Sequence, residues 1–171
     1  RLNMKNNRWF KVKPKNDQQQ EALETLCDPD IDLVILEGAA GSGKTFLALA
    51  AGLGQVLDYK TYKEILFTRA PIGVGVDMGY LPGDEQDKLA PWCGALFDNI
   101  ETLVGGEDLT NAFIRTKIKI KAMQFMRGRS LMNKYVIIDE VQNMAPSELK
   151  VLVTRAGEGT KIVVMGDTSQ I

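Results

Sequence analysis

One short stretch of this sequence has the residue types and spacing of a phosphate-binding loop. Positions 38 to 45 fit the pattern G-x-x-x-x-G-K-[ST], in which backbone N–H groups wrap the phosphates of a nucleotide. In that pattern Lys44 places its charge on the β- and γ-phosphates, and the Thr45 hydroxyl can ligate Mg²⁺. The alternative is a glycine turn that precedes a helix by chance. We predict that nucleotide phosphates bind at Gly38, Ala39, Ala40, Gly41, Ser42, Gly43, Lys44 and Thr45.

Acidic and amide side chains follow two other apolar runs. Asp139 and Glu140 come directly after the run 135–138, and Gln170 comes shortly after the run 161–165. Beside a phosphate loop, Asp139 can hold Mg²⁺, and Glu140 can orient and deprotonate an attacking water. The Gln170 amide can then hydrogen-bond the γ-phosphate or that water, because ligands of open α/β sheets bind at the carboxyl ends of strands. Two surface acids and a polar loop are the alternative.

Gln19 is a candidate for recognising a base. It lies just before the phosphate-loop strand, where its side-chain amide could pair with both the donor and the acceptor on an adenine edge. It is one of three successive glutamines, so a plain polar helix face is nearly as good an explanation.

The composition narrows the chemistry further. The 171 residues suffice for one domain with a sizeable core, and 44% apolar with 25% charged residues is ordinary for a globular protein. The sequence contains no histidine, which excludes Ser-His-Asp and Cys-His catalysis and every His-ligated metal site. Acid–base work therefore falls to carboxylates, Lys, Tyr or Cys. No apolar run approaches roughly 18 residues and no signal-peptide pattern opens the chain, so we expect a cytoplasmic protein without membrane contact.

Basic residues are concentrated in two stretches that contain no acid. Residues 1–15 carry six of them and residues 109–138 carry seven, whereas the rest of the chain has eight basic residues and all 22 acids. In the second stretch, Lys117, Lys119 and Lys121 alternate with isoleucines and would share one face of a strand. Such stretches are usually solvated faces, but aromatic residues lie among these basic ones. The distribution makes nucleic acid a candidate partner.

Short apolar runs alternate with helix-forming segments along the chain. This alternation predicts a three-layer α/β domain with a mainly parallel sheet. Asn16 or Asp17 can cap the first helix, and Pro91 is expected to interrupt a later one. We assign residues 1–12 to a basic N-terminal segment and residues 13–171 to the domain. The expected strands are 9–13, 31–37, 64–69, 117–121, 135–138 and 161–165, and the expected helices are 16–27, 45–57, 84–104 and 146–154.

Several motifs together resemble the PhoH-like ATPases, a family similar to the superfamily one helicase-type ATPases. The resemblance begins with Pro14-Lys15-Asn16-x-x-Gln19 and the phosphate loop, and it continues through Gly75-x-Asp77-x-Gly79-Tyr80-Leu81-Pro82-Gly83. Its later parts are Arg127-Gly128-Arg129-Ser130, Ile138-Asp139-Glu140-x-Gln142-Asn143 and Gly166-Asp167-x-x-Gln170-Ile171.

The resemblance implies a RecA-like P-loop core that binds ATP with Mg²⁺ and hydrolyses it. It also implies a nucleic-acid partner, with RNA favoured. Carried over residue by residue, the implied contacts are adenine for Gln19, the phosphates for Lys44, Mg²⁺ for Thr45 and Asp139, the attacking water for Glu140 and the γ-phosphate for Gln170. A nucleotide-gated binding module or oligomeric switch with little turnover is the alternative function.

Two departures from the family pattern bear on these expectations. The family follows the strand-end arginine directly with proline, whereas Arg69 here is followed by Ala70-Pro71. The family also continues with further motifs beyond Ile171, so we expect that the C-terminal part of the domain is missing. We further expect a native start at Met4, with no PIN ribonuclease domain before it.

Three arginines are candidates for the positive charge that phosphoryl transfer requires. Arg69 follows a predicted strand, and Arg127 and Arg129 precede the strand that ends in Asp139. We expect them to face nucleic acid or the nucleotide of an adjacent subunit. The second arrangement requires a homo-oligomer, and we expect a ring. The alternative is that Arg127 or Arg129 pairs with an acid and braces the loop.

Overall fold

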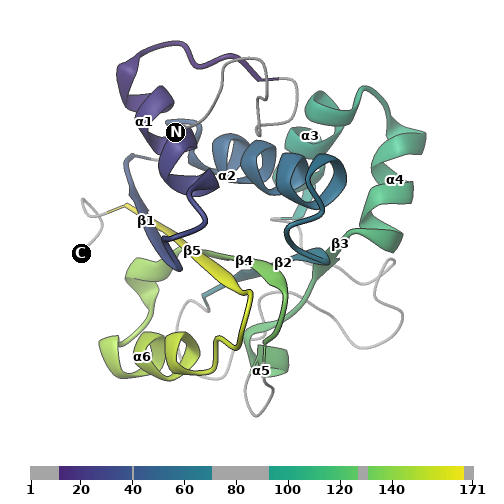
Figure 1. Cartoon of the computed structure of the whole chain (residues 1–171). Coiled ribbons are helices and arrows are strands. Elements are labelled where there is room, and N and C mark those ends of the chain that lie inside the picture. Colours follow the sequence, from purple (N-terminus) through teal and green to yellow (C-terminus); the bar gives the residue numbers. More distant parts are fainter. Residues whose placement is uncertain (1–11, 40, 71–92, 127–130, 168–171) are drawn as a thin grey trace.

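Five parallel strands form the centre of the molecule (Figure 1). The computed structural model describes residues 12–39, 41–70, 93–126 and 131–167. Within these ranges the sheet has the strand order β1-β5-β4-β2-β3, and every neighbouring pair is parallel. The strands are β1 (Leu33–Glu37), β2 (Glu64–Arg69), β3 (Ile118–Ile120), β4 (Lys134–Asp139) and β5 (Lys161–Gly166).

Helices cover both faces of this sheet. Figure 1 shows α1 to α4 on one face and α5 and α6 on the other, which is the predicted three-layer α/β architecture. α2 continues into a π-helix, Gly54–Asp58, and a short 3-10 helix, Val141–Asn143, follows β4. The α-helices are α1 (Asp17–Cys27), α2 (Lys44–Leu53), α3 (Cys93–Val104), α4 (Glu107–Thr116), α5 (Met123–Met126) and α6 (Pro146–Thr154).

The carboxyl ends of the strands lie along one edge of the sheet, because all the strands are parallel. At this edge Glu37 of β1 is the register partner of Gly166 of β5, and Arg69 of β2 is the partner of Asp139 of β4. β5 lies between the strand that precedes the phosphate loop and the strand that ends in Asp139. Segments far apart in the sequence therefore meet at one edge.

Alternate residues of the central strands pack into two separate cores. On β4, Tyr135 and Ile137 face the helices α1 to α3, whereas Val136 and Ile138 face α6. Tyr135 is fully buried, and its hydroxyl donates a 2.8 Å hydrogen bond to the carbonyl oxygen of Ala48 in α2. Glycine is required at position 52, because an added Cβ would lie 2.7 Å from the Tyr135 ring. This close contact holds the helix that follows the phosphate loop against β4.

The helix predictions are mostly confirmed. Asn16 caps α1, and its side chain accepts a 2.9 Å hydrogen bond from the N–H of Gln19. The helix predicted over 45–57 comprises α2 and most of the π-helix. The described part of the helix predicted over 84–104 forms α3, and its first part, with Pro91, lies outside the described residues.

The strand predictions are correct within the sheet and wrong near the amino terminus. β2 has its predicted bounds, and β1, β4 and β5 differ from prediction by one or two residues at their ends. In β3, Ile118 and Ile120 are buried and Lys119 between them is partly exposed, which confirms the alternation. Val12 and Lys13, the described part of the strand predicted over 9–13, form no strand. Val12 packs instead into the core beside α1 to α3.

The sequence prediction misses α4. Gly105 ends α3 as predicted, with a φ angle of 93° and an N–H that donates to the carbonyl oxygen of Glu101 at 2.9 Å. A new helix begins only two residues later, so the glycine pair at 105 and 106 is a turn between two helices rather than the end of helical structure. Within the described ranges, no helix has the length and apolar character needed to cross a membrane.

Candidate functional site

The loop between β1 and α2 has the backbone shape of a phosphate-binding loop. Gly38 donates a 3.2 Å hydrogen bond from its N–H to the carbonyl oxygen of Gly166 at the end of β5. Gly41 and Gly43 have φ angles of 82° and 88°, in the left-handed region that favours glycine. A Cβ at position 38 would lie 2.8 Å from the Ser42 Oγ. The glycines therefore permit this path, which leads directly into the N-terminus of α2.

Lys44 begins α2 and folds its side chain back over the loop. Its Nζ donates hydrogen bonds to the carbonyl oxygens of Gly38 at 2.5 Å and Ala39 at 3.0 Å. The Ser42 Oγ accepts a third at 3.4 Å. Gly41 and Ser42, next to this ammonium group, are exposed. A fixed cation beside an exposed glycine loop at a helix N-terminus is an arrangement suited to binding phosphate.

A cavity of about 440 Å³ lies over this loop at the carboxyl edge of the sheet. Its volume falls within the range of small-molecule sites, roughly 300–1,000 Å³. Five elements contribute to it: the phosphate loop with α2, the ends of β2, β4 and β5, and one side of α3. The lining residues are Gly41, Ser42, Gly43, Lys44, Thr45, Phe46, Arg69, Ala95, Asn99, Asp139, Glu140, Gly166 and Asp167.

The structure brings together the predicted site residues Lys44, Thr45, Arg69, Asp139 and Glu140 in this one cavity. Gln19 is not among the described lining residues. Its Oε1 accepts a 2.8 Å hydrogen bond from the N–H of Lys15, so it closes the start of α1, and its contact with adenine stays a prediction. Ala40, Arg127, Arg129 and Gln170 lie outside the described residues, and their roles stay predictions.

The ends of β2 and β4 form a charged cluster on one wall of the cavity. The Arg69 Nη2 lies 3.4 Å from the Asp139 Oδ2 and 3.6 Å from the Glu140 Oε1. The Glu140 N–H also donates to the Asp139 Oδ1 at 2.8 Å. Burial raises the pKa of the Asp139 carboxyl, and the guanidinium of Arg69 and the Glu140 N–H oppose that rise only in part. Arg69 therefore pairs with both acids at the end of β4.

Glu140 has a backbone conformation that is rare for a residue with a side chain. Its φ and ψ angles of 56° and 40° are left-handed, which costs about 1–3 kcal/mol and is common at functional sites. The Gln142 Nε2 donates a 2.5 Å hydrogen bond to the Glu140 Oε2. The Gln142 Oε1 in turn accepts a 3.2 Å hydrogen bond from the N–H of Asp167. The Oε2 of Glu140 is therefore hydrogen-bonded by Gln142, and its Oε1 is within ion-pair distance of Arg69.

Oxygen donors in the cavity suit a magnesium ion that is shared with a nucleotide. Thr45 and Asp139 line the same cavity, and a hydroxyl with a carboxylate is a donor set that Mg²⁺ accepts. Among the described residues there is no group of three or more His, Cys, Asp or Glu side chains that could hold a metal by themselves. Mg²⁺ is usually bound by one or two carboxylates together with substrate phosphates, so the residues present fit this ion.

Sequence reasoning missed the contributions of Gln142 and of α3. Gln142 stands inside the motif 138–143, but its spacing alone says nothing about which partners its amide meets. Asn99 and Ala95 enter the cavity because α3 packs beside α2. The Asn99 Nδ2 donates to the carbonyl oxygen of Ala95 at 3.1 Å. No local pattern in the sequence indicates that this side of α3 would face the phosphate loop.

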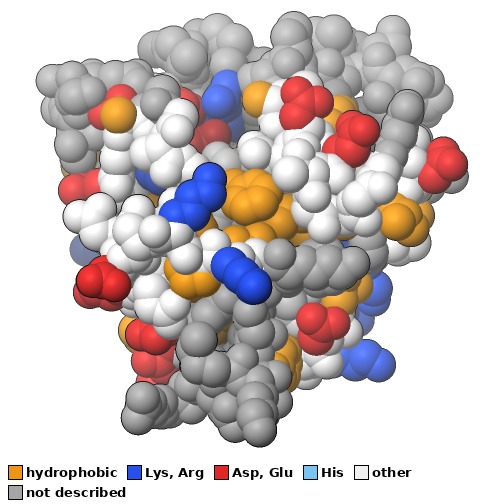
Figure 2. Space-filling model, turned by 90° about the horizontal axis from the view of Figure 1, so that it is seen from above, with side chains coloured by type: hydrophobic (Ala, Val, Ile, Leu, Met, Phe, Trp, Pro, Cys, Tyr) orange, Lys and Arg blue, Asp and Glu red, His pale blue; other side chains and the backbone are white. Residues whose placement is uncertain are grey.

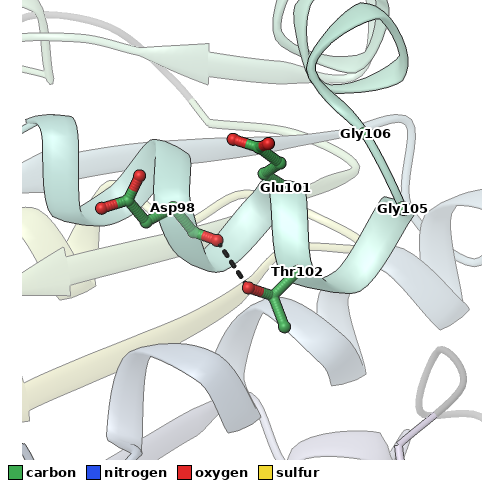
Figure 3. A pocket seen from close by; sticks show the side chains of 5 residues that line it. All are labelled: Asp98, Glu101, Thr102, Gly105 and Gly106. Carbon is green, nitrogen blue, oxygen red and sulfur yellow. Dashed lines mark hydrogen bonds between the residues drawn. The ribbon is translucent and has the colours of Figure 1, made fainter.

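A second hollow, of about 470 Å³, lies at the turn between α3 and α4. Figure 3 shows its lining, in which the carboxylates of Asp98 and Glu101 point away from Thr102. The Thr102 hydroxyl donates a 2.9 Å hydrogen bond to the carbonyl oxygen of Asp98 in its own helix. Its remaining lining is the pair Gly105 and Gly106. These polar groups do not converge on a common point, unlike those of a ligand site.

The surface above α1 to α4 carries charges of both signs. Figure 2 shows this face, with acidic side chains toward α1 as well as on the side of α3 and α4. Asp98, Glu101 and Asp108 are exposed there. Such a margin repels phosphate backbones, so a nucleic-acid interface is not expected over α3 and α4.

Comparison with known proteins agrees with the motifs of the sequence. The family model of the PhoH-like proteins matches residues 11–171. The chain belongs to the PhoH-like family. It is 48% identical to protein PhoH2 of Bacillus subtilis, in an alignment that covers 94% of this chain and 37% of that protein. It is 36% identical to a PhoH-like protein of Synechocystis, with 93% of this chain and 48% of that protein covered.

The chain therefore spans less than half of the length of these curated relatives. Among solved structures, domain III of the replication initiation protein DnaA from Thermotoga maritima aligns over 97% of this chain and 57% of that one. The sequence identity is 15% and the TM-score is 0.40, a likeness too slight to carry a functional argument. Membership of the PhoH-like family, together with the phosphate loop, establishes a P-loop nucleotide-binding fold.

Proposed function

We propose that this domain binds ATP with Mg²⁺ and hydrolyses it, and that hydrolysis is coupled to RNA or another nucleic acid in a helicase-like manner. One observation carries the proposal. Lys44 and Thr45 of the phosphate loop share a single cavity with Asp139 and Glu140, which come from a strand two places away in the sheet. Only the fold brings these four side chains together.

The proposed chemistry assigns a task to each group. The loop N–H groups and Lys44 bind the β- and γ-phosphates, and Thr45 and Asp139 would hold the Mg²⁺. The ion, when bound, neutralises charge that develops on the phosphates. Glu140 orients the attacking water and accepts its proton, a task for a carboxylate because the chain has no histidine. Gln170, four residues beyond the end of β5 at Gly166 and outside the described residues, is assigned to the γ-phosphate.

Arg69 supplies positive charge next to the position proposed for the γ-phosphate. It lines the cavity and contacts both acids of β4. An arginine in this place can stabilise charge on the transferred phosphoryl group from within the same subunit. Arg127 and Arg129 are then the candidates for contact with nucleic acid or with a neighbouring subunit.

Three features support nucleic acid as the partner. The acid-free stretch 109–138 carries seven basic residues, and its partly exposed Lys117, Lys119 and Lys121 lie along β3 at the sheet edge. The motif resemblance favours RNA over DNA. The compartment that this proposal assigns is the cytoplasm, where ATP and RNA are both available.

A second candidate function is a nucleotide-gated binding module or oligomeric switch with little turnover. It is the alternative that the sequence leaves open. A homo-oligomer such as a ring would let Arg127 and Arg129 of one subunit complete the site of its neighbour. Molecular mass in solution, measured with and without ATP, tests this: a monomer under both conditions contradicts the oligomer.

The test of the first function is phosphate release from Mg·ATP, measured alone and with single-stranded RNA, duplex RNA and DNA. We expect turnover that RNA stimulates, and we expect Lys44→Ala and Glu140→Gln each to lower it by about a hundredfold or more. Hydrolysis that neither substitution lowers would refute the proposal. Tight ATP binding with no turnover under any condition would favour the switch.

A further inference from the structure

The side chain of Gln142 connects the ends of two neighbouring strands. Its amide nitrogen donates to the Glu140 carboxylate after β4, and its amide oxygen accepts from the Asp167 N–H after β5. The heavy-atom distances are 2.5 Å and 3.2 Å. One amide group thus hydrogen-bonds both the proposed general base and the backbone that precedes Gln170.

We infer that Gln142 is a positioning residue, which fixes the Glu140 carboxylate for catalysis and ties its position to the carboxyl end of β5. The inference rests on the proposed function, because it requires Glu140 to be the base. It adds a regulatory consequence. A ligand that contacts Gly166 or Asp167, both of which line the cavity, shifts the amide of Gln142 and with it the base.

The geometry of Glu140 explains why a positioning residue is needed. Its left-handed backbone directs the chain away from β4 into the 3-10 helix. Its side chain is 28% exposed to solvent. A partly exposed carboxylate on a short turn has several rotamers of similar energy. Arg69, at 3.6 Å from one oxygen, is too distant to select one of them, whereas Gln142 bonds the other oxygen at 2.5 Å.

The space around the amide of Gln142 is tight on the side of β5. A Cβ at Gly166 would lie 3.0 Å from the Gln142 Oε1 and 2.8 Å from the Val141 Cγ1. Glycine at position 166 therefore leaves the room that the amide occupies, and a side chain there would press on the amide. Packing of this kind transmits small displacements between neighbouring elements. Alanine at position 166 should accordingly push the amide of Gln142 off Glu140.

Two substitutions separate the two hydrogen bonds. Gln142→Glu keeps an acceptor for the Asp167 N–H but sets a carboxylate against Glu140, and Gln142→Met removes both bonds at similar volume. We expect each to lower kcat for ATP by about tenfold to a hundredfold, the range typical of groups that orient a functional ligand. The KM for ATP and the affinity for a fluorescent ATP analogue should stay within about twofold, because the phosphate loop is untouched.

The matched control is Gln20→Met. Gln20 also donates to a glutamate, with its Nε2 2.7 Å from the Glu24 Oε1, but this pair lies on α1 outside the described lining of the cavity. The Gln20→Met substitution should leave the kcat and the KM for ATP unchanged. Gly166→Ala should resemble Gln142→Met in kcat, and thermal unfolding of every variant shows whether it is folded.

A double-mutant cycle shows whether Gln142 acts through Glu140. In a Glu140→Gln background, Gln142→Met should cause no further loss of kcat, since the group that it positions is already gone. Equal losses in both backgrounds would overturn the inference, and so would an unchanged kcat in folded Gln142→Glu and Gln142→Met proteins. If wild type hydrolyses no ATP, or Glu140→Gln stays fully active, the proposed function fails instead.

A readout independent of turnover completes the test. The side-chain amide protons of Gln142 can be assigned by NMR, as the signals that disappear in Gln142→Glu. We expect these signals to shift by several tenths of a ppm in Glu140→Gln, because the charged acceptor is lost. Signals that stay unchanged would show that the bond to Glu140 does not exist in solution, which also overturns the inference.

Discussion

Two cavities lined by described residues are nearly equal in volume and differ in the elements that supply their side chains. The cavity over the phosphate loop measures about 440 Å³ and the hollow between α3 and α4 about 470 Å³. The first is lined by three acidic residues and the second by two, and each contains at least two glycines. In the first, Asp139 and Glu140 come from the end of a central strand and contact an arginine from the neighbouring strand. In the second, both acids lie on one helix and point away from Thr102 (Figure 3).

This comparison shows that the candidate site is distinguished by polar side chains that point at one place. Its volume and its number of acidic residues do not distinguish it. Parallel strands deliver their carboxyl ends to one edge, so the fold gathers Arg69, Asp139 and Glu140 beside the loop after β1. A single exposed helix turn has no such means of directing its side chains at one point. Paired substitutions, one in the first cavity and one at a control position, test whether only the first cavity is functional.

The largest contrast is expected between Glu140→Gln and Glu101→Gln. The first removes the proposed base while keeping its shape, and we expect kcat for ATP to fall by about a hundredfold to ten-thousandfold. The second changes an exposed acid in the hollow and should leave kcat unchanged. Steady-state phosphate release measures both, and comparable losses in the two variants would contradict the assignment.

The next contrast concerns nucleotide binding. Lys44→Ala removes the ammonium group that lies over the loop, and we expect ATP affinity or kcat to fall by about a hundredfold, as for loss of one preorganised charge on the phosphates. Lys150→Ala, on the exposed surface of α6, is the control and should be neutral. Titration with a fluorescent ATP analogue gives the affinities, and undiminished binding to a folded, inactive Lys44→Ala protein would restrict its role to catalysis.

Much of the first cavity could be predicted from the sequence, because its parts are local. The glycine loop, the acids after 135–138 and the cap at Asn16 each depend on neighbouring residues alone. The strand order could not be predicted, and so neither could the pairing of Arg69 with Asp139. The same holds for Asn99, whose place in the lining depends on how α3 packs against α2.

The missed helix and the missed role of Gln142 have a shared cause. In both places the sequence shows where a regular element ends but not where the chain goes next. Two glycines after α3 are compatible with a loop or with a turn into another helix, and packing of α4 on α3 and β3 decides for the helix. Likewise, an amide two residues after Glu140 meets Asp167 only because β5 lies beside β4.

A smaller effect is expected on the scaffold that carries the first cavity. Tyr135→Phe removes the buried hydroxyl that bonds the carbonyl oxygen of Ala48, and it should lower the free energy of unfolding by about 1 kcal/mol. For a domain of this size, that corresponds to about 2–4 °C in the melting temperature. An unchanged melting temperature would show that packing alone holds α2 on β4.

The smallest effect should be a pH dependence of stability that belongs to the first cavity alone. Burial raises the pKa of Asp139 above its ordinary value of 3.8, so the folded protein binds this proton more tightly than the unfolded chain. The stabilisation from this proton is therefore complete at pH values below the pKa of Asp139 in the unfolded chain. It is lost as the pH rises through the higher pKa of Asp139 in the folded protein. Asp139→Asn should remove that slope and raise the melting temperature at neutral pH without Mg²⁺.

The control for this prediction is Asp98→Asn, at an exposed position in the hollow, which should change stability by no more than about 0.5 kcal/mol. A lower melting temperature for Asp139→Asn at neutral pH would show that the ion pair with Arg69 outweighs the cost of burying the carboxylate.

The central claim is that Mg·ATP binds in the cavity shared by the phosphate loop and the ends of β2, β4 and β5. A crystal structure with Mg²⁺ and a non-hydrolysable ATP analogue tests it most directly. The account predicts phosphates on the N–H groups of the loop from Gly41 to Thr45, Mg²⁺ between Thr45 and Asp139, and Glu140 facing the γ-phosphate. An analogue bound at the α3–α4 hollow, or a metal that Asp139 does not contact, would contradict it.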